Sequence, residues 1–211
     1  RHVLFENCAG SYPPEFECQQ LLTFNSVPLK TVWRVRPAVV DWLADGQLHY
    51  LCLDDLGRLS DFKKLSKTEL HEKRHFTWED GTVVTFTEDV GGGRGRVKLC
   101  VCDWNERGRF DLIVGTHARA SLPPGPKGEP RHSTGQAGIF YLENIGSNAL
   151  PVFAKPQAFQ FKGEIIQMGM HVASPEAVDW TGTGELGLLV GVEDGSLVWL
   201  DRRHLSYAGD L

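Results

Sequence analysis

The sequence has no strong excess of either charge and no long apolar run. Lysine and arginine number 22 against 27 aspartates and glutamates, for a formal net charge of -5. Without a basic stripe to neutralise phosphates, the composition argues against a nucleic-acid partner. No apolar run reaches the length of a membrane span, and there is no secretory signal at Arg1. At 41% hydrophobic residues, the chain can still build a core.

Cysteine is scarce, and no stretch of any length has helical periodicity. The five cysteines are an odd number. Cys52, Cys100 and Cys102 fall inside apolar strand patterns, where a free thiol packs as a small apolar group. Cys8 and Cys18 lie in loop-like sequence, and they either form a disulfide in an oxidising compartment or remain free thiols. The absence of a helix signal predicts a nearly all-β chain.

What the sequence does contain is one motif in three copies. The pattern Asp-Trp-x-x-x-Gly, followed two residues later by an apolar run, begins at Asp41, Asp103 and Asp179. Short apolar runs on both sides of a glycine-containing turn predict a strand, a tight loop and a second strand. The intervals are 103 − 41 = 62 and 179 − 103 = 76 residues. These intervals suit propeller blades that carry insertions.

The copies divide the chain into units of about 14–65, 66–147 and 148–201, each opening with an outer strand. Val3–Asn7 resembles residues 139–144, and both are followed by a Gly and then by Pro-x-Phe. Residues 1–13 are therefore predicted to end a preceding unit, with residue 1 an internal point of a longer chain. Residues 117–136 are expected to be a long insertion within one sheet, and residues 202–211 a polar tail.

The third copy is the most regular, and it resembles a known repeat. It runs from Pro175-Glu176-Ala177-Val178-Asp179-Trp180 through Gly184–Gly191 to Asp194-Gly195-Ser196-Leu197-Val198-Trp199-Leu200. This pattern resembles the FG-GAP/VCBS repeat, which implies four-stranded blades of a seven- or eight-bladed β-propeller. The chain would hold about three blades, with missing blades or another chain completing the ring, since three cannot close it.

The same resemblance says less about function. Integrin-like adhesion domains, polysaccharide lyases and many secreted proteins share this repeat, so it indicates a fold more than an activity. The resemblance also implies that the protein is extracellular or periplasmic.

The resemblance also implies Ca2+ in the turn of each copy, held by oxygen ligands at alternate positions. The second copy keeps Asp103, Asn105 and Asp111, which makes it the candidate metal site. The copies depart from the pattern, because Leu43 supplies no oxygen, Arg107 is a cation and Gly187 removes the last ligand. In the alternative, each Asp caps its turn by accepting backbone N–H bonds, and Arg107 pairs with Asp111 in place of the ion. The tryptophan after each Asp is expected to pack between blades.

Basic residues precede the innermost strand of each unit. They fall in Trp33-Arg34-Val35-Arg36, Gly95-Arg96-Val97-Lys98 and Met170-His171-Val172. We expect Arg34, Arg36, Arg96 and His171 to converge at one mouth of the central channel. Arginine binds a carboxylate with two hydrogen bonds, and histidine acts as a base or acid near neutral pH. These groups suit an acidic oligo- or polysaccharide, with His171 as the candidate catalytic residue.

His117 and Arg131, on the long insertion, are further candidate substrate-binding residues. In the alternative, all of these side chains only hydrogen-bond neighbouring blades and solvent. The sequence therefore leaves two alternative functions: a carbohydrate-processing propeller such as a polysaccharide lyase, and a non-catalytic propeller that binds a protein or glycan. An added Tyr or His near His171 in a missing blade would favour catalysis, because a lone base without a partner acid indicates binding.

Overall fold

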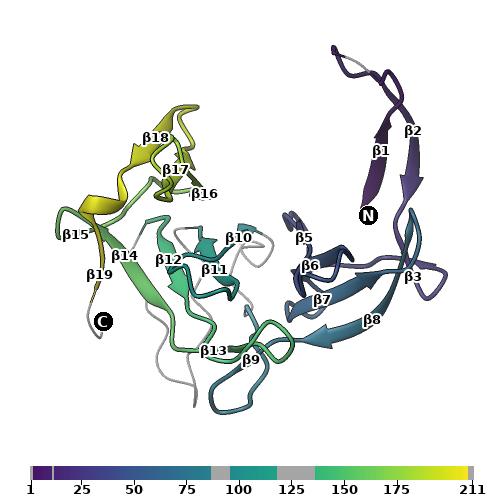
Figure 1. Ribbon diagram of the computed structural model, residues 1–211, viewed down its shortest axis with the longest axis horizontal. Helices are drawn as coiled ribbons and strands as arrows, with labels where there is room; N and C mark the ends of the chain where they lie inside the picture. The colour runs from purple at the N-terminus through teal and green to yellow at the C-terminus, as the bar shows by residue number, and fades with distance from the viewer. Residues whose placement is uncertain (1, 11, 87–95, 118–135, 209–211) are drawn as a thin grey trace.

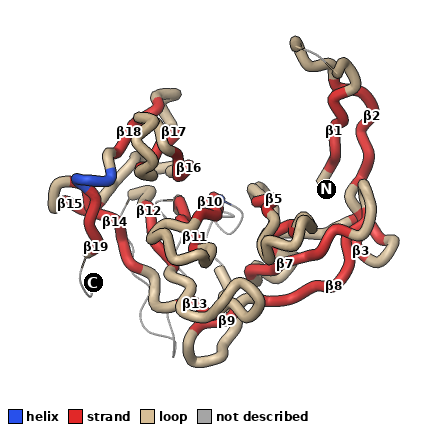
Figure 2. The backbone as a smooth tube through the Cα atoms, viewed as in Figure 1, coloured by secondary structure: helices blue, strands red, loops and turns tan. Residues whose placement is uncertain are grey.

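The computed structural model describes residues 2–10, 12–86, 96–117 and 136–208. Within these ranges, regular structure consists of β-strands and one 3-10 turn, η3 (Arg202–His204) (Figure 2). The predicted all-β class is therefore confirmed. The described residues include no long apolar helix of the kind that crosses a membrane. The strands form several open sheets that follow one another along an arc (Figure 1).

The first sheet is a two-stranded hairpin that projects from the rest of the arc (Figure 1). It pairs β1 (Val3–Asn7) with β2 (Phe16–Leu21) in antiparallel orientation. At the end of β1, the Asn7 side chain organises the connecting loop, because its Oδ1 accepts the backbone N–H groups of Ala9 and Glu15, each at 3.2 Å.

The second sheet contains an antiparallel meander whose strands follow chain order from the inner edge outward. These strands are β5 (Ala38–Val40), β6 (His49–Leu53), β7 (Leu59–Lys64) and β8 (Glu69–His75). Two short strands, β3 (Thr23–Phe24) and β4 (Val27–Pro28), extend the sheet beyond β8. β6 is buried along its whole length because it lies in the middle of the meander.

The third sheet repeats this arrangement and the fourth repeats part of it. The third runs through β10 (Lys98–Cys102), β11 (Asp111–Gly115), β12 (Ile139–Leu142), β14 (Gln157–Phe161) and β15 (Glu164–Ile165). A parallel pair, β9 (Thr77–Trp78) with β13 (Val152–Phe153), joins it to the second sheet. The fourth sheet consists of β16 (Ser174–Val178), β17 (Gly187–Gly191) and β18 (Leu197–Leu200).

The sheets do not follow the unit boundaries expected from the sequence. β8 pairs with β7, so residues 69–75 join the sheet of the first copy and not the predicted unit 66–147. β14 pairs with β12, which moves residues 157–161 from the predicted unit 148–201 into the sheet of the second copy. The reason is the direction of the meander, in which an outer strand follows its partners along the chain. The expected polar tail is also partly a strand, because β19 (Leu205–Tyr207) pairs with β14.

The three Asp-Trp turns share one hydrogen-bond pattern. In each, Oδ1 of the Asp accepts the N–H four residues later, and Oδ2 accepts the N–H of the glycine five residues later. The two distances are 3.1 and 2.9 Å for Asp41, 2.8 and 2.6 Å for Asp103, and 3.0 and 2.8 Å for Asp179. These glycines have φ values between 70° and 87°, where a side chain would be strained. The prediction that the Asp caps its turn is confirmed.

Two of the three motif tryptophans are buried between sheets. Trp42 is fully buried, and its Nε1 donates to the Asn148 carbonyl at 2.7 Å. Trp104 is 2% exposed, and the Arg202 guanidinium lies 3.9 Å above its ring. Trp180 is 61% exposed, so the expectation that all three pack between sheets is wrong for the third copy. The physical reason is that no further sheet follows the fourth one within the described residues.

The innermost strands β5, β10 and β16 lie next to one another on the inside of the arc (Figure 1). A parallel bridge joins Arg36, just before β5, to Lys98 at the start of β10. This arrangement gathers the residues that precede the inner strands at one place. The cysteines of the strands, Cys52, Cys100 and Cys102, are buried free thiols as predicted, and Cys8 is an exposed free thiol.

Candidate functional site

Four basic side chains gather where the inner strands begin. They are Arg34, Arg36, Arg96 and Lys98, and we call them the cation cluster. The Lys98 Nζ donates to the Arg34 carbonyl at 3.3 Å. Burial lowers the pKa of Lys98, and the neighbouring positive charges of Arg36, Arg34 and Arg96 lower it further. Three predicted site residues are thus brought together, and Lys98 joins them.

Arg36 connects the cation cluster to β16. Its Nη1 donates to the Ser174 Oγ at 2.9 Å, and its Nη2 pairs with the Glu176 carboxylate at 3.2 Å. The side chains of this ion pair are 43% and 54% exposed, so water screens their attraction. Within the described ranges, the carboxylate that pairs with the cluster is that of Glu176, against four positive charges. The cluster therefore keeps the capacity to bind an anion.

Trp33 adds an exposed aromatic ring to the cation cluster. It is 63% exposed, and the Arg34 guanidinium lies 3.9 Å above its ring. Arg34 has a φ of 65°, a left-handed conformation that turns its side chain back toward Trp33. Trp33 and Lys98 are not among the site residues predicted from the sequence. The sequence signal that could have identified them is an aromatic or basic residue within two positions of a selected arginine.

His171 lies beyond Ser174, at a shallow hollow of about 490 Å3. The hollow is lined by His171, Val172, Ser174, Gly191, Val192 and Glu193. The His171 Nδ1 lies 2.6 Å from the Glu193 Oε2, which also accepts the backbone N–H groups of Met170 and His171. These hydrogen bonds, that from the His171 ring first, lower the pKa of Glu193. The ring is thus oriented by a carboxylate while its side chain stays 70% exposed.

This hollow supplies one base and its orienting carboxylate. The six lining residues contain no second imidazole and no phenol that could act as the partner acid. An elimination needs proton removal from carbon and protonation of the leaving oxygen. Ser174 links the hollow to the cation cluster through Arg36.

Of the two candidates from the long insertion, His117 lies within the described residues. His117 follows the end of β11, and Gly115 of that strand pairs with Lys98. This register places His117 at the same end of the third sheet as the cation cluster. Arg131 lies outside the described residues.

The space beneath each Asp-Trp turn, where Ca2+ would bind, is filled differently in each copy. Eight residues after the Asp stand His49, Asp111 and Gly187. In the first copy, the His49 Nδ1 lies 2.8 Å from the Asp61 Oδ1, and both side chains are buried. Arg74 donates to the other oxygen of Asp61 at 2.7 Å. This carboxylate is therefore already neutralised by a side chain.

In the second copy, the guanidinium of Arg107 stands among the expected calcium ligands. It donates to Asp111 at 2.9 Å and pairs with Glu143. The Asp103 oxygens accept backbone N–H groups, and the Asn105 Oδ1 accepts from Arg202 at 3.1 Å. A fixed positive charge and engaged oxygens do not fit a divalent cation. The described residues also contain no cluster of three metal-ligating side chains.

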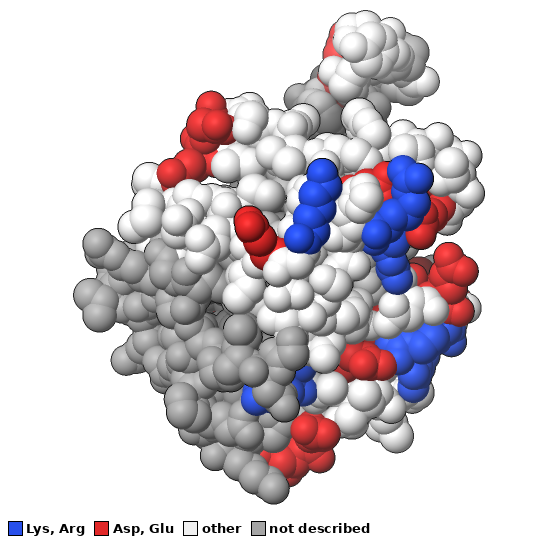
Figure 3. All heavy atoms as spheres, turned by 90° about the vertical axis from the view of Figure 1, so that its left-hand side faces the viewer, with Lys and Arg blue, Asp and Glu red and all other residues white. Residues whose placement is uncertain are grey.

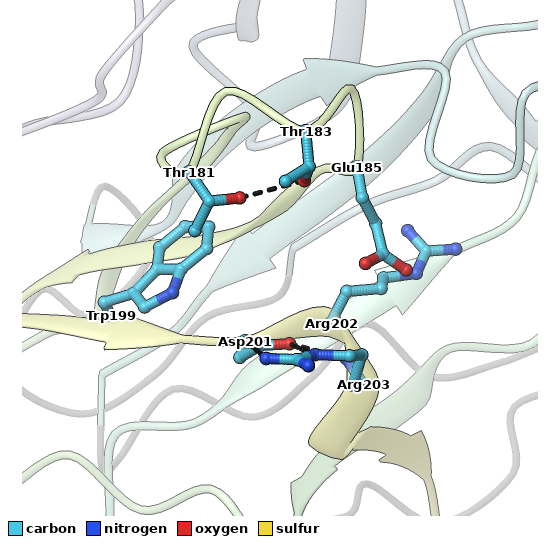
Figure 4. Close-up of a pocket in the computed structure, with 7 residues that line it drawn as sticks. All are labelled: Thr181, Thr183, Glu185, Trp199, Asp201, Arg202 and Arg203. Carbon is cyan, nitrogen blue, oxygen red and sulfur yellow. Dashed lines mark hydrogen bonds and ion pairs between the residues drawn. The ribbon is translucent and has the colours of Figure 1, made fainter.

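In the third copy, an indole fills the space beneath the turn. A Cβ built at Gly187 would lie 2.3 Å from the Cη2 atom of Trp199. Glycine is therefore required here by the tryptophan of the neighbouring strand. The same tryptophan lines a second hollow of about 290 Å3, which lies between the turn and the end of β18 (Figure 4). Thr181, Thr183, Glu185, Asp201, Arg202 and Arg203 complete its lining.

Removal of divalent metal is expected to leave the three described Asp-Trp turns unchanged. Because Arg107 supplies the positive charge beneath the second turn, treatment with a chelator should not shift the midpoint of thermal unfolding. The measurement compares melting curves in excess EDTA and in millimolar Ca2+ at the same ionic strength. A midpoint that rises with Ca2+ and saturates would contradict this prediction and would support a calcium site.

Figure 3 shows the side on which β14, β15 and β18 lie, where basic and acidic residues are interspersed between large uncharged areas.

Comparison with known proteins adds no family. A scan against protein-family models finds no match, and neither the curated proteins nor the solved structures contain a match to this chain.

Proposed function

We propose that this chain is part of a β-propeller that binds acidic saccharides at the cation cluster, outside the cell or in the periplasm. The observation that carries the proposal is the gathering of four cations beside the exposed Trp33 ring. Arginine pairs with the carboxylate of a uronic acid through two parallel hydrogen bonds. The apolar C–H face of the same sugar packs against an indole ring.

The propeller arrangement is supported by three features. The second and third sheets each contain a four-stranded antiparallel meander ordered from the inside outward. Their innermost strands lie next to one another along the arc (Figure 1). The three Asp-Trp turns repeat one hydrogen-bond pattern, as expected for equivalent turns of successive blades. In this arrangement the remaining blades, or another chain, complete the ring.

Binding is proposed in preference to catalysis. In a lyase, a base removes the proton beside the carboxylate, and the glycosidic C–O bond breaks as a carbon–carbon double bond forms. His171 would be that base, with Glu193 orienting its ring. Among the described residues that line the hollow there is no second imidazole and no phenol to protonate the departing oxygen, and Glu193 is already engaged with His171, which supports a binding module.

Substitution of the cation cluster is expected to weaken binding of acidic sugars. In Arg36→Ala, loss of one charge-assisted pair should raise the dissociation constant for an oligouronate by about tenfold or more. Trp33→Ala should have a comparable effect through lost packing. Isothermal titration calorimetry measures the dissociation constants of both variants, with oligouronates and with neutral oligosaccharides of equal length.

Two controls sharpen this experiment. Lys162→Ala removes an exposed cation from the loop after β14 and should leave the dissociation constant unchanged. Wild-type affinity should also fall as salt is added, because the attraction is between exposed charges. Equal affinity for acidic and neutral sugars would contradict the proposal. Release of an unsaturated product, detected by its ultraviolet absorbance and lost in His171→Ala, would show that the protein is a lyase.

A further inference from the structure

We propose that the cation cluster has two anion-binding positions, that Glu176 occupies one of them as an internal stand-in for a ligand carboxylate, and that the ligand is a saccharide with acidic groups on neighbouring sugars. This inference rests on the proposed function and deepens it. A ligand of this kind displaces Glu176 from Arg36 and fills both positions. Glu176 is then the residue that sets how strongly the cluster binds such a chain.

The guanidinium of Arg36 is shared between two residues of β16. Its Nη1 donates to the Ser174 Oγ at 2.9 Å, and its Nη2 donates to the Glu176 Oε2 at 3.2 Å. Residues two apart on a strand project from the same face, so both partners come from one side of β16. Pro175, between them, is buried on the other side, where its Cδ would lie 2.5 Å from a Cβ at Gly115. Packing of β16 on the third sheet therefore brings the Glu176 carboxylate to Arg36.

The ion pair between Arg36 and Glu176 is one that a ligand can replace. One hydrogen bond, from Nη2, reaches the carboxylate, whereas the strongest arginine–carboxylate pairs have two parallel bonds. Both side chains are also about half exposed, and exposed pairs contribute little to stability. A ligand carboxylate that accepts two hydrogen bonds from the guanidinium therefore displaces Glu176 at a small cost in free energy.

The second anion-binding position lies at Lys98. Burial lowers the pKa of Lys98, and the charges of Arg36, Arg34 and Arg96 lower it further, so the field at its ammonium group is positive. Among the described residues, the buried Nε of Arg96 has no hydrogen-bond partner. The Glu176 carboxylate is placed on Arg36, at the β16 side of the cluster. An anionic group beside Lys98 offsets the repulsion among the cations and finds charged donors there.

The two positions are neighbours, because a parallel bridge joins Arg36 to Lys98 and because β5, β10 and β16 lie next to one another (Figure 1). A saccharide with acidic groups on neighbouring sugars fills both positions and displaces Glu176. A saccharide with one acidic group fills the position at Lys98 and leaves Glu176 in place. Glu176 therefore weakens binding of the first kind of ligand and has little effect on the second.

Glu176→Gln tests the proposal, because glutamine keeps the size of the side chain and loses its charge. In isothermal titration calorimetry, the dissociation constant for a homo-oligouronate should fall by about tenfold, since Arg36 no longer has a competing carboxylate. For an oligosaccharide of equal length with a single uronate, the dissociation constant should stay within about twofold of the wild-type value. The Glu176 side chain is 54% exposed, and circular dichroism checks that the variant is folded.

Two further variants separate the local contact from the overall charge of the protein. Glu164→Gln removes the same charge from an exposed position on β15, and it should bind both ligands like the wild type. In the Arg36→Ala background, Glu176→Gln should no longer strengthen binding of the homo-oligouronate, because the position that Glu176 occupies is lost. Such non-additivity is expected of two residues in direct contact.

Three results would overturn the proposal. The first is unchanged or weaker binding of the homo-oligouronate by Glu176→Gln, which would mean that Glu176 does not compete with the ligand. The second is an equal gain for both ligands, and the third is an equal gain in Glu164→Gln or in the Arg36→Ala background. A wild type that binds acidic and neutral sugars alike contradicts the saccharide site itself. A wild type that prefers acidic sugars, with affinities that Glu176→Gln leaves unchanged, contradicts the role of Glu176 alone.

Discussion

Replacement of Gly115 by alanine is expected to lower the free energy of unfolding by about 3 kcal/mol. The added methyl group would lie 2.0 Å from the Ala173 carbonyl oxygen and 2.5 Å from the Pro175 Cδ. Neither a backbone carbonyl nor a proline ring can rotate away, so the fourth sheet would have to move off the third. Urea unfolding, monitored by tryptophan fluorescence at low protein concentration, measures the change in the free energy of unfolding.

Gly191→Ala is the matched control. This glycine occupies the equivalent strand end, neither residue has a positive φ, and the nearest contact to an added Cβ is 3.8 Å. The substitution should change the free energy of unfolding by no more than about 0.5 kcal/mol. Similar losses in both variants would mean that the close approach of the third and fourth sheets does not limit stability. A loss of unfolding free energy seen in Gly115→Ala and not in Gly191→Ala would show that the close approach of the third and fourth sheets limits stability.

The second large effect is expected on removing the guanidinium beneath the second turn. Asp111 is fully buried and accepts hydrogen bonds from Arg107, from the Tyr141 hydroxyl and from the Asn144 backbone N–H. Arg107→Ala leaves the carboxylate among neutral donors only. Breaking a buried ion pair from one side should cost about 3 kcal/mol of unfolding free energy. Thermal and urea unfolding measure this loss.

The loss of unfolding free energy in Arg107→Ala should increase with pH. Burial already raises the pKa of Asp111, while its hydrogen bonds and Arg107 act in the opposite sense. Without Arg107, the pKa of the folded protein rises further above the usual value of 3.8. The native state then binds more protons than the unfolded state between these two pKa values, so stability falls as pH rises through that interval. The deficit of Arg107→Ala should therefore be smallest in acid and largest at neutral pH.

A surface pair provides the control for this experiment. Arg203 is 72% exposed and forms an ion pair with Asp201. Arg203→Ala should leave the unfolding midpoint unchanged within error, because water screens exposed pairs. A deficit in Arg107→Ala that is the same at every pH would show that the loss comes from packing and not from the buried charge.

The local features of this chain could be read from the sequence. The pattern Asp-Trp-x-x-x-Gly predicts a capped turn, because the Asp oxygens and the backbone N–H groups they accept lie within five residues. The likeness of Val3–Asn7 to residues 139–144 is confirmed as well, since Asn7 and Asn144 make the same local hydrogen bonds. The burial of Cys52, Cys100 and Cys102 follows from their apolar strand patterns in the same way.

The candidate site was predicted in part. Arg34, Arg36 and Arg96 were selected because they precede inner strands, and adjacent inner strands bring their first residues together. Trp33 was missed because its role depends on the left-handed backbone of Arg34, which sets the guanidinium over the ring. The link from Arg36 to Ser174 spans 138 residues, and sequence spacing carries no information about such a contact.

By itself, then, the sequence determined the all-β class, through its lack of helical periodicity. It also determined the three turns and the likeness of the segments at β1 and β12, because these depend on hydrogen bonds between residues close in the chain. The tertiary structure decided which sheet β8 and β14 join, what fills the space beneath each turn, and that Trp180 stays exposed. The identical Asp-Trp pair is buried at Trp42 and Trp104 and open at Trp180 because burial depends on the sheet that packs against it. That neighbour is a property of the assembled arc and not of the motif.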